Sequence, residues 1–223
     1  MQHLSENHEL NAYVTTITSH VRLHPSEHGV YVTPTRLHEA VEKLGESGIG
    51  VKKSFKNCSI IWVAVYSNRA SRRSHNVSVK IFKNMMLHIT GAHSLEMIAV
   101  VVDKLSNILS KLLDVTLNKR GDLRVTMVNY KYVLPGRVNL SNLVRQLMNR
   151  GTLVIFEPSN YAGARVKVPI LDSRKTASIM IFESGKVIII MPETKDRDDA
   201  LSFIREFIDQ QIVLNWNFIQ LEK

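Results

Sequence analysis

A series of histidines near the start of the chain is the first pattern that could support chemistry. His20, His24 and His28 recur at every fourth position, which on a helix would place three imidazoles on one face, as a metal site requires. Pro25 and Gly29 favour a loop in this segment instead, and no carboxylate or thiolate follows with matching spacing. We therefore predict no metal ion and no other cofactor, and the reason for the histidine spacing stays open.

Residues that could carry out catalysis are equally sparse. Cys58 has no nearby candidate for a catalytic triad, and Glu157 or Asp172 would act as general acids only as isolated carboxyl groups. The run Ser184–Lys186 is too short for a phosphate-cradling loop, and the chain contains neither a Walker motif nor a dinucleotide-binding glycine pattern. We expect a protein that is not an enzyme.

The composition is that of a globular protein with an excess of positive charge. The 223 residues include 29 Lys and Arg against 20 Asp and Glu, which gives a net charge of +9, and 44% of them are hydrophobic. The length allows one large domain or two small ones. The basic excess favours an anionic partner.

Three features of the sequence favour an intracellular location. The single cysteine excludes an internal disulfide framework and suits a reducing compartment. No apolar run approaches the roughly 18 to 20 residues of a membrane-spanning helix. Residues 1–10 also lack the basic start and the apolar stretch of a secretory signal.

An internal repeat organises the chain. Val79–Ile89 and Ile179–Ile189 each read as a strand, a tight polar turn and a second strand, which predicts a hairpin. A segment with apolar residues at helical spacing follows each hairpin, at Ser94–Leu113 and Thr194–Ile212. The two hairpin-and-helix units therefore predict two halves with the same fold.

The front of each half also matches. Strands are predicted at Tyr13–Thr18 and Arg124–Asn129, and each leads into a short amphipathic helix. The apolar positions of these two helices are Leu37, Val41, Leu44 and Leu140, Val144, Leu147. We predict an α+β fold with an N-terminal tail at 1–12, a first repeat at 13–115 and a second at 116–223.

Some predicted strands are apolar on both faces. Ile60–Val65 and Val187–Met191 do not alternate, so the sheet face away from the helices is either covered by another layer or left open as an apolar binding surface. Four helices can cover only one face of a sheet of eight to ten strands. The open face is therefore the favoured interpretation.

The second half resembles the C-terminal repeat of the TATA-box-binding proteins. The resemblance rests on Phe156–Val168 and on Ala177–Val187, which contains Ile-Phe-Glu-Ser-Gly-Lys-Val. In the first half, Ile81-Phe82 and the run Ile89–Ser94 are similar to the family's N-terminal repeat. The chain is most like the diverged members found in large DNA viruses. The resemblance implies two pseudo-symmetric repeats that form a curved antiparallel sheet, a saddle with helices on its convex face.

The resemblance also implies a transcription initiation factor that binds and bends duplex DNA through the minor groove. The implied DNA wedges form two pairs, Tyr161 with Phe182 in the second half and Phe55 with Phe82 in the first. The implied contacts to base edges and the groove floor are Asn129, Thr18, Thr90, Val187 and Ile189. The implied phosphate contacts are Lys186, Lys167, Arg165, Lys80 and Lys83.

Partners and location are implied in the same way. An acidic turn at Glu157 and Pro158 matches the stirrup that docks a B-type general initiation factor, and hence the RNA polymerase machinery. The expected DNA is an AT-rich promoter, and the expected location is the nucleus or a viral transcription compartment of a host cell, with packaging in virions also open. The alternative is a TBP-like or helix-grip scaffold that binds another ligand or protein without TATA-specific recognition. A homodimer is also open, because an unoccupied apolar face could bury itself against a second copy.

Overall fold

The computed structural model describes residues 12–66, 74–134, 136–170, 174–213 and 219–220, so the expected tail at 1–12 lies almost entirely outside the described residues. The chain forms two compact units, an N-terminal unit of residues 15–127 and a C-terminal unit that contains residues 128–223 and the start of the chain up to Val14. The boundary between the units falls inside a strand, and the predicted limit between the two repeats, 115/116, lies just before that strand and stays a prediction. Among the described residues, no helix has the length and apolar character needed to cross a membrane.

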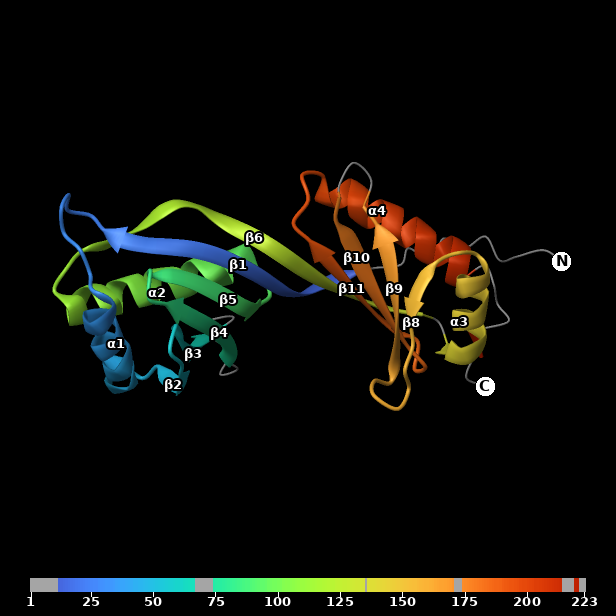
Figure 1. The fold of residues 1–223 in the computed structure, drawn as a ribbon, viewed down its shortest axis with the longest axis horizontal. Coiled ribbons are helices and arrows are strands. Elements are labelled where there is room, and N and C mark those ends of the chain that lie inside the picture. Colours follow the sequence, from blue (N-terminus) through green and yellow to red (C-terminus); the bar gives the residue numbers. More distant parts are fainter. Residues whose placement is uncertain (1–11, 67–73, 135, 171–173, 214–218, 221–223) are drawn as a thin grey trace. The chain divides into compact units, whose positions relative to one another are not determined.

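The N-terminal unit is a six-stranded sheet with two helices (Figure 1). Its elements are β1 (Tyr13–Pro25), α1 (Pro34–Glu42), a 3-10 turn η1 (Lys43–Ser47), β2 (Gly50–Ser54), β3 (Cys58–Tyr66), β4 (Ser74–Phe82), β5 (Met86–Ala92), α2 (Leu95–Leu113) and the first part of β6 (Leu117–Val133). The strand order is β2-β3-β4-β5-β1-β6. From β2 to β1 every neighbouring pair is antiparallel.

The C-terminal unit repeats this plan. It contains the rest of β6, β7 (Arg137–Val138), α3 (Leu140–Asn149), β8 (Leu153–Ile155), β9 (Gly163–Pro169), β10 (Thr176–Phe182), β11 (Lys186–Pro192), α4 (Arg197–Ile208), a π-helical turn η2 (Asp209–Val213) and β12 (Ile219–Gln220). Its main sheet has the order β6-β11-β10-β9-β8, and β7 pairs with β12. Strand, helix, four strands and helix recur in both units, which confirms the α+β class and the internal repeat.

Local sequence signals explain where the helices begin. Thr33, Ser94 and Asn139 cap α1, α2 and α3, because their side-chain oxygens accept from backbone N–H groups in the first turn at 3.3, 3.2 and 3.1 Å. α4 has two aspartates in its first turn instead, Asp198 and Asp199, next to the positive end of the helix dipole. The predicted apolar positions of α2 are confirmed as core, since Ile98, Val101, Val102, Leu105 and Leu109 are all buried.

The two hairpins that defined the repeat share one turn geometry. Met85 and Gly185 both adopt a left-handed conformation, and their N–H groups donate to the carbonyls of Phe82 and Phe182 at 2.8 and 3.0 Å. The turn of the second hairpin also packs against the backbone after β6, where Leu134 donates to the carbonyl of Gly185 at 2.8 Å. A Cβ on Gly185 would collide with the carbonyl oxygen of Gly136, so this turn requires glycine.

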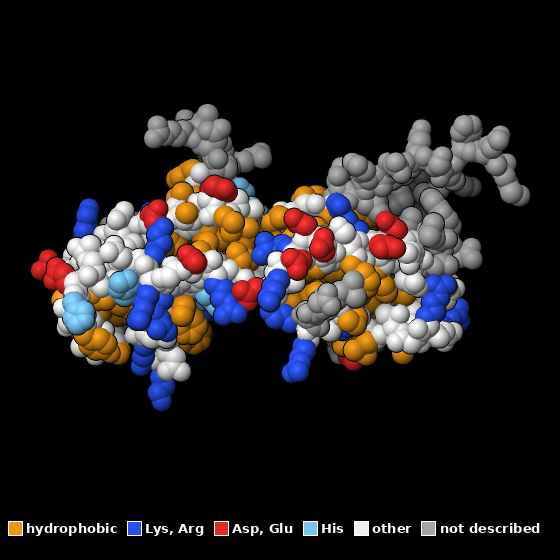
Figure 2. Space-filling model, turned by 90° about the horizontal axis from the view of Figure 1, so that it is seen from above, with side chains coloured by type: hydrophobic (Ala, Val, Ile, Leu, Met, Phe, Trp, Pro, Cys, Tyr) orange, Lys and Arg blue, Asp and Glu red, His pale blue; other side chains and the backbone are white. Residues whose placement is uncertain are grey.

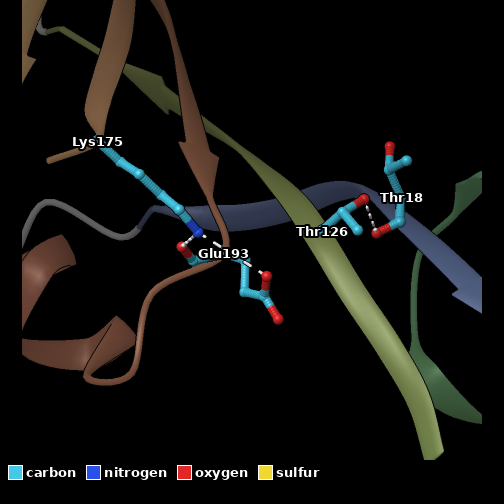
Figure 3. Close-up of polar contacts among 4 residues, drawn as sticks. All are labelled: Thr18, Thr126, Lys175 and Glu193. Carbon is cyan, nitrogen blue, oxygen red and sulfur yellow. Dashed lines mark hydrogen bonds and ion pairs between the residues drawn. The ribbon is translucent and has the colours of Figure 1, made fainter. Parts of the chain in front are cut away.

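The opposite ends of β10 and β11 are closed by a polar contact (Figure 3). Lys175 Nζ donates to the backbone oxygen of Glu193 at 2.6 Å and lies 3.8 Å from that residue's carboxylate. Lys175 ends the connection between β9 and β10, which is closed where the Ile170 N–H donates to the carbonyl of Lys175 at 3.1 Å. Residues 171–173, which include the candidate acid Asp172, lie outside the described residues.

Each main sheet buries one face under helices and leaves the other partly exposed. On β3, Ser59, Ile61, Val63 and Val65 are buried, while the alternate residues Cys58, Ile60, Trp62, Ala64 and Tyr66 retain exposed surface. Among the described residues, no second layer of helices or strands covers this alternate face. The apolar strands in the sequence favoured such an uncovered face over one buried under another layer. We call it the open face.

The same alternation corrects one prediction. Val187 and Ile189, expected on the groove floor, are fully buried on the helix-covered face of β11. Ile188 and Ile190 lie on the open face instead. An error of one residue places a strand side chain on the opposite face of its sheet.

Candidate nucleic-acid interface

In the C-terminal unit the open face combines apolar and cationic side chains in rows across the strands. Met180 on β10 pairs with Ile188 on β11 and with Arg165 on β9. One row further, Ser178 lies between Ile190 and Lys167. Lys167 Nζ donates to Ser178 Oγ at 2.6 Å. Two cations on β9 therefore share rows with the apolar residues of β11, and the largely buried Met180 and Ser178 of β10 lie between them.

The outer strand of this sheet extends the same surface. Leu153 and Ile155 on β8 pair with Lys167 and Arg165, and both remain exposed, Leu153 to 64%. Neither residue was singled out in the sequence, because a three-residue strand carries too little pattern to recognise. Their exposure makes the edge of the open face apolar.

Two aromatic side chains pack together where β10 ends. The rings of Tyr161 and Phe182 meet edge to face, with centroids 5.8 Å apart, and Tyr161 is 43% exposed. Gly163 pairs with Phe182 across the sheet, and a Cβ there would lie 3.0 Å from both rings. Lys186 Nζ lies 5.9 Å from the Phe182 ring centroid. Tyr161 and Phe182, the two rings that the resemblance pairs, are therefore in contact, and their role as DNA wedges stays a prediction.

The corresponding pair in the N-terminal unit is not formed. Phe82 lies on the open face of β4, opposite Cys58. Phe55, its predicted partner, lies in a tight turn where its N–H donates to the carbonyl of Cys58 at 2.8 Å. Its ring lies 4.8 Å from Lys53 Nζ and borders a cavity of about 330 Å³ beside α1, and none of the ring contacts among the described residues joins it to Phe82. A turn this short does not carry Phe55 over the sheet, as the longer loop from 156 to 162 carries Tyr161.

The residues predicted to contact base edges differ in exposure. Thr90 lies on the open face of β5 opposite Ser78, and Asn129 on β6 is half-buried. Thr18 is almost fully buried, and its carbonyl accepts from Thr126 Oγ1 at 3.3 Å (Figure 3). Thr90 and Asn129 therefore retain some exposed surface, whereas the carbonyl of Thr18 joins β1 to β6.

Two further cations accompany Phe82. Lys80 lies on the open face of β4 opposite Ile60, and Lys83 is exposed in the turn after the strand. A third cation is Lys52, whose Nζ lies 5.0 Å from the ring centroid of the exposed Trp62. Trp62 lies on the open face and is 36% exposed.

The early histidines lie on a strand and not in the predicted loop. β1 extends through His20 and His24 to Pro25, and only His28 falls in the following turn. Among the described residues, no group of three or more His, Cys, Asp or Glu side chains is placed to hold a metal ion. His20 instead packs edge to face against His88 of β5, with ring centroids 4.6 Å apart.

The predicted stirrup is an exposed turn between β8 and β9. The backbone oxygen of Glu157 accepts from the N–H groups of Asn160 and Tyr161, both at 2.9 Å, and its carboxylate accepts from Asn160 Nδ2 at 2.8 Å. Pro158 borders a cavity of about 480 Å³ together with Arg137 and Glu183, which form a 2.9 Å ion pair. The turn thus presents a carboxylate and an apolar ring next to a hollow.

Comparison with known proteins shows the fold. No protein-family model matches the chain, and no curated protein matches it. The solved structure of Methanococcus jannaschii TBP is similar, with a TM-score of 0.54 and 19% sequence identity over 90% of this chain and 98% of that one. The chain has a TBP-like fold.

Charge in the TBP-like C-terminal unit is divided between its two faces. Figure 2 shows Asp and Glu side chains gathered over the region that α4 occupies in Figure 1. The acidic residues at the start of that helix are Asp196, Asp198 and Asp199. The open face instead carries cations, at Arg165, Lys167 and Lys186. The three cations therefore attract an anionic ligand to the open face.

Proposed function

We propose that this protein binds duplex DNA through the open faces of its two units and bends it from the minor groove, as a TBP-like transcription initiation factor. The observation that carries this proposal is the contact between Tyr161 and Phe182 at the end of the sheet. Gly163 leaves room for the two rings, and Lys186 lies beside them. Minor-groove proteins insert apolar side chains between base steps and kink the duplex.

The rest of the open face supports the same use. Ile188 and Ile190 offer an apolar floor, and Arg165 and Lys186 are exposed cations that reach phosphates. Phe82 supplies an aromatic side chain in the N-terminal unit, and within the described part of that unit no ring contact pairs it as Tyr161 pairs with Phe182. We therefore propose that the C-terminal unit makes the stronger kink.

The proposal extends to partners. The Glu157–Pro158 turn would dock a B-type initiation factor, through which a polymerase is recruited to an AT-rich promoter, as in the diverged proteins of large DNA viruses that the sequence resembles. We propose a non-enzymatic role inside the cell. Charge reversal at Glu157 is then expected to abolish ternary-complex formation while leaving binary DNA binding intact.

The test is a binding titration of AT-rich and GC-rich duplexes at several salt concentrations. We expect preferential binding of the AT-rich duplex and a steep loss of affinity with salt, because phosphate contacts release counterions. Tyr161→Ala is expected to weaken binding severalfold. Tyr31→Ala is the matched control, because Tyr31 is 73% exposed in the loop before α1 and not on a sheet.

One outcome favours the alternative function. If neither duplex binds at low salt, the proposal is wrong and the exposed apolar side chains of the open face serve a protein or small-molecule ligand. If Tyr161→Ala and Tyr31→Ala bind DNA equally well, DNA binding stands but the wedge role of Tyr161 does not.

A further inference from the structure

A row of basic side chains crosses the open face of the N-terminal unit. Lys80 on β4 pairs with His88 on β5, and His88 pairs with His20 on β1. Beyond Lys80 the row continues through Ile60 to Lys53 on β2. We call Lys80, His88 and His20 the basic row. All three retain exposed surface.

The basic row explains the histidine spacing in the sequence. Along β1, Val21 and Leu23 are buried in the core, so the alternate residues His20, Arg22 and His24 share the open face. A spacing of four on a strand repeats one face, just as it does on a helix. His20 and His24 therefore lie on the same face of β1, and His24 extends the basic row along that strand.

The other repeat has no such row. At the positions equivalent to Lys80 and His88, the C-terminal unit carries Met180 and Ile188. The basic row thus places charge where the repeat otherwise builds an apolar floor. Its members also stay uncompensated, because none forms an ion pair with a carboxylate among the described residues.

We propose that the basic row binds acceptor atoms of duplex DNA and binds them more tightly when its histidines are protonated. This inference rests on the proposed function and deepens it, because it assigns the N-terminal unit a polar, pH-dependent contact that the C-terminal unit lacks. Ammonium and imidazolium groups present only N–H donors. The minor groove of A·T pairs presents only acceptors, and the flanking phosphates are anionic.

The electrostatics give the sign of the pH dependence. Burial lowers the pKa of His88 below its ordinary value near 6.5, and the charges of His20 and Lys80 lower it further. The other charged group on a neighbouring strand is Arg22, which pairs with Met86 next to His88. Without bound DNA, the His88 imidazole is therefore mostly neutral near pH 7. DNA acceptors favour the protonated form, so binding takes up protons and tightens as the pH falls.

The experiment measures affinity for a 20-base-pair AT-rich duplex between pH 8 and pH 5.5 at constant salt. Each histidine whose pKa rises by about one unit on binding contributes about a tenfold gain in affinity at the acidic end. We expect His88→Gln to remove most of this gain and Lys80→Met to lower the salt slope by about one. His28→Gln is the control, because His28 lies exposed in the turn after β1 and is expected to leave the profile unchanged.

Two further duplexes separate the two sources of acceptors. Inosine·cytosine pairs lack the minor-groove amino group of G·C pairs, so they present acceptors as A·T pairs do. If the row reads base edges, the pH-dependent gain is retained with inosine·cytosine and lost with G·C. If it binds phosphates, all three duplexes show the same gain. A flat profile for the wild type, or a profile that His88→Gln leaves unchanged, overturns the proposal.

An NMR titration of the histidine rings keeps this test separate from that of the proposed function. If the duplex binds but leaves the pKa of His88 unchanged, the basic row is wrong and DNA binding stands. If no duplex binds, yet tripolyphosphate raises the pKa of His88, the row is an anion site and the DNA function is wrong. If a poly-glutamate peptide raises it where tripolyphosphate and DNA do not, the row serves an acidic protein, which overturns the proposal as stated.

Discussion

Gly163→Ala tests the contact between Tyr161 and Phe182 without removing either ring. The added Cβ would lie 3.0 Å from the Cε1 atoms of both rings, whereas carbon atoms prefer to be roughly 3.5 to 4.0 Å apart. The two rings, whose centroids lie 5.8 Å apart, must therefore move away from residue 163 by several tenths of an ångström, which disturbs their edge-to-face contact. An edge-to-face pair contributes about 0.5 to 1.5 kcal/mol, most of which is lost when the rings part.

Gly50→Ala is the matched control for this substitution. Gly50 also lies on an open-face strand position, but a Cβ there would meet only the Cβ of Trp62, at an ordinary 3.9 Å. Both substitutions reduce the backbone freedom of the unfolded chain equally. The difference in their effects therefore isolates the ring contact.

We expect Gly163→Ala to lower the free energy of unfolding by about 1 kcal/mol relative to Gly50→Ala, measured by urea denaturation. A duplex-binding assay should show a loss of roughly fivefold for Gly163→Ala alone, since that is the factor corresponding to about 1 kcal/mol. Equal stability of the two variants would refute the packing argument. A stability difference without a binding difference would refute the role of the pair in DNA binding.

Three further substitutions test the fold, a buried carboxyl group and the phosphate contacts. Gly185→Ala is expected to destabilise by about 2 kcal/mol more than Gly151→Ala, because both glycines have positive φ but only Gly185 meets backbone; equal melting temperatures would contradict this. Burial raises the pKa of Asp209 above its ordinary value near 3.8, so its ionisation destabilises the fold as the pH rises through that range, and Asp209→Asn should raise the melting temperature at pH 7 but not below pH 3.8. If Asp209→Asn still has the higher melting temperature below pH 3.8, ionisation of Asp209 is not the cause. Arg165→Met should reduce the salt slope of DNA binding by about one, and Lys43→Met on the helical side should leave it unchanged; equal slopes would remove Arg165 from the phosphate contacts.

The repeat made much of the fold predictable from the sequence. The strands that end at Phe82 and Phe182 lead into turns of the same length, so the two hairpins can be aligned residue by residue. Apolar residues at helical spacing placed α2 correctly, because helix periodicity survives small errors of boundary. The fold class therefore followed from local pattern and repetition alone.

The sequence was less informative about which face each residue occupies. Val187 and Ile189 were assigned to the groove floor in a strand that is apolar throughout, where nothing in the residue types marks the register. Phe55 was assigned by a loose match across a turn whose length differs between the halves. The pairing of His20 with His88 joins β1 to β5, a long-range contact that no local pattern reveals.

The measurement that tests the central claim most directly is energy transfer between dyes at the two ends of an AT-rich duplex. We predict that the wild-type protein shortens the end-to-end distance, because aromatic wedges kink the duplex. Replacing both Phe82 and Phe182 with alanine should restore the straight-duplex value while some salt-dependent binding remains. An end-to-end distance that the wild-type protein does not change at saturation, or one that the double variant shortens as much as the wild type does, would contradict DNA bending by the open face.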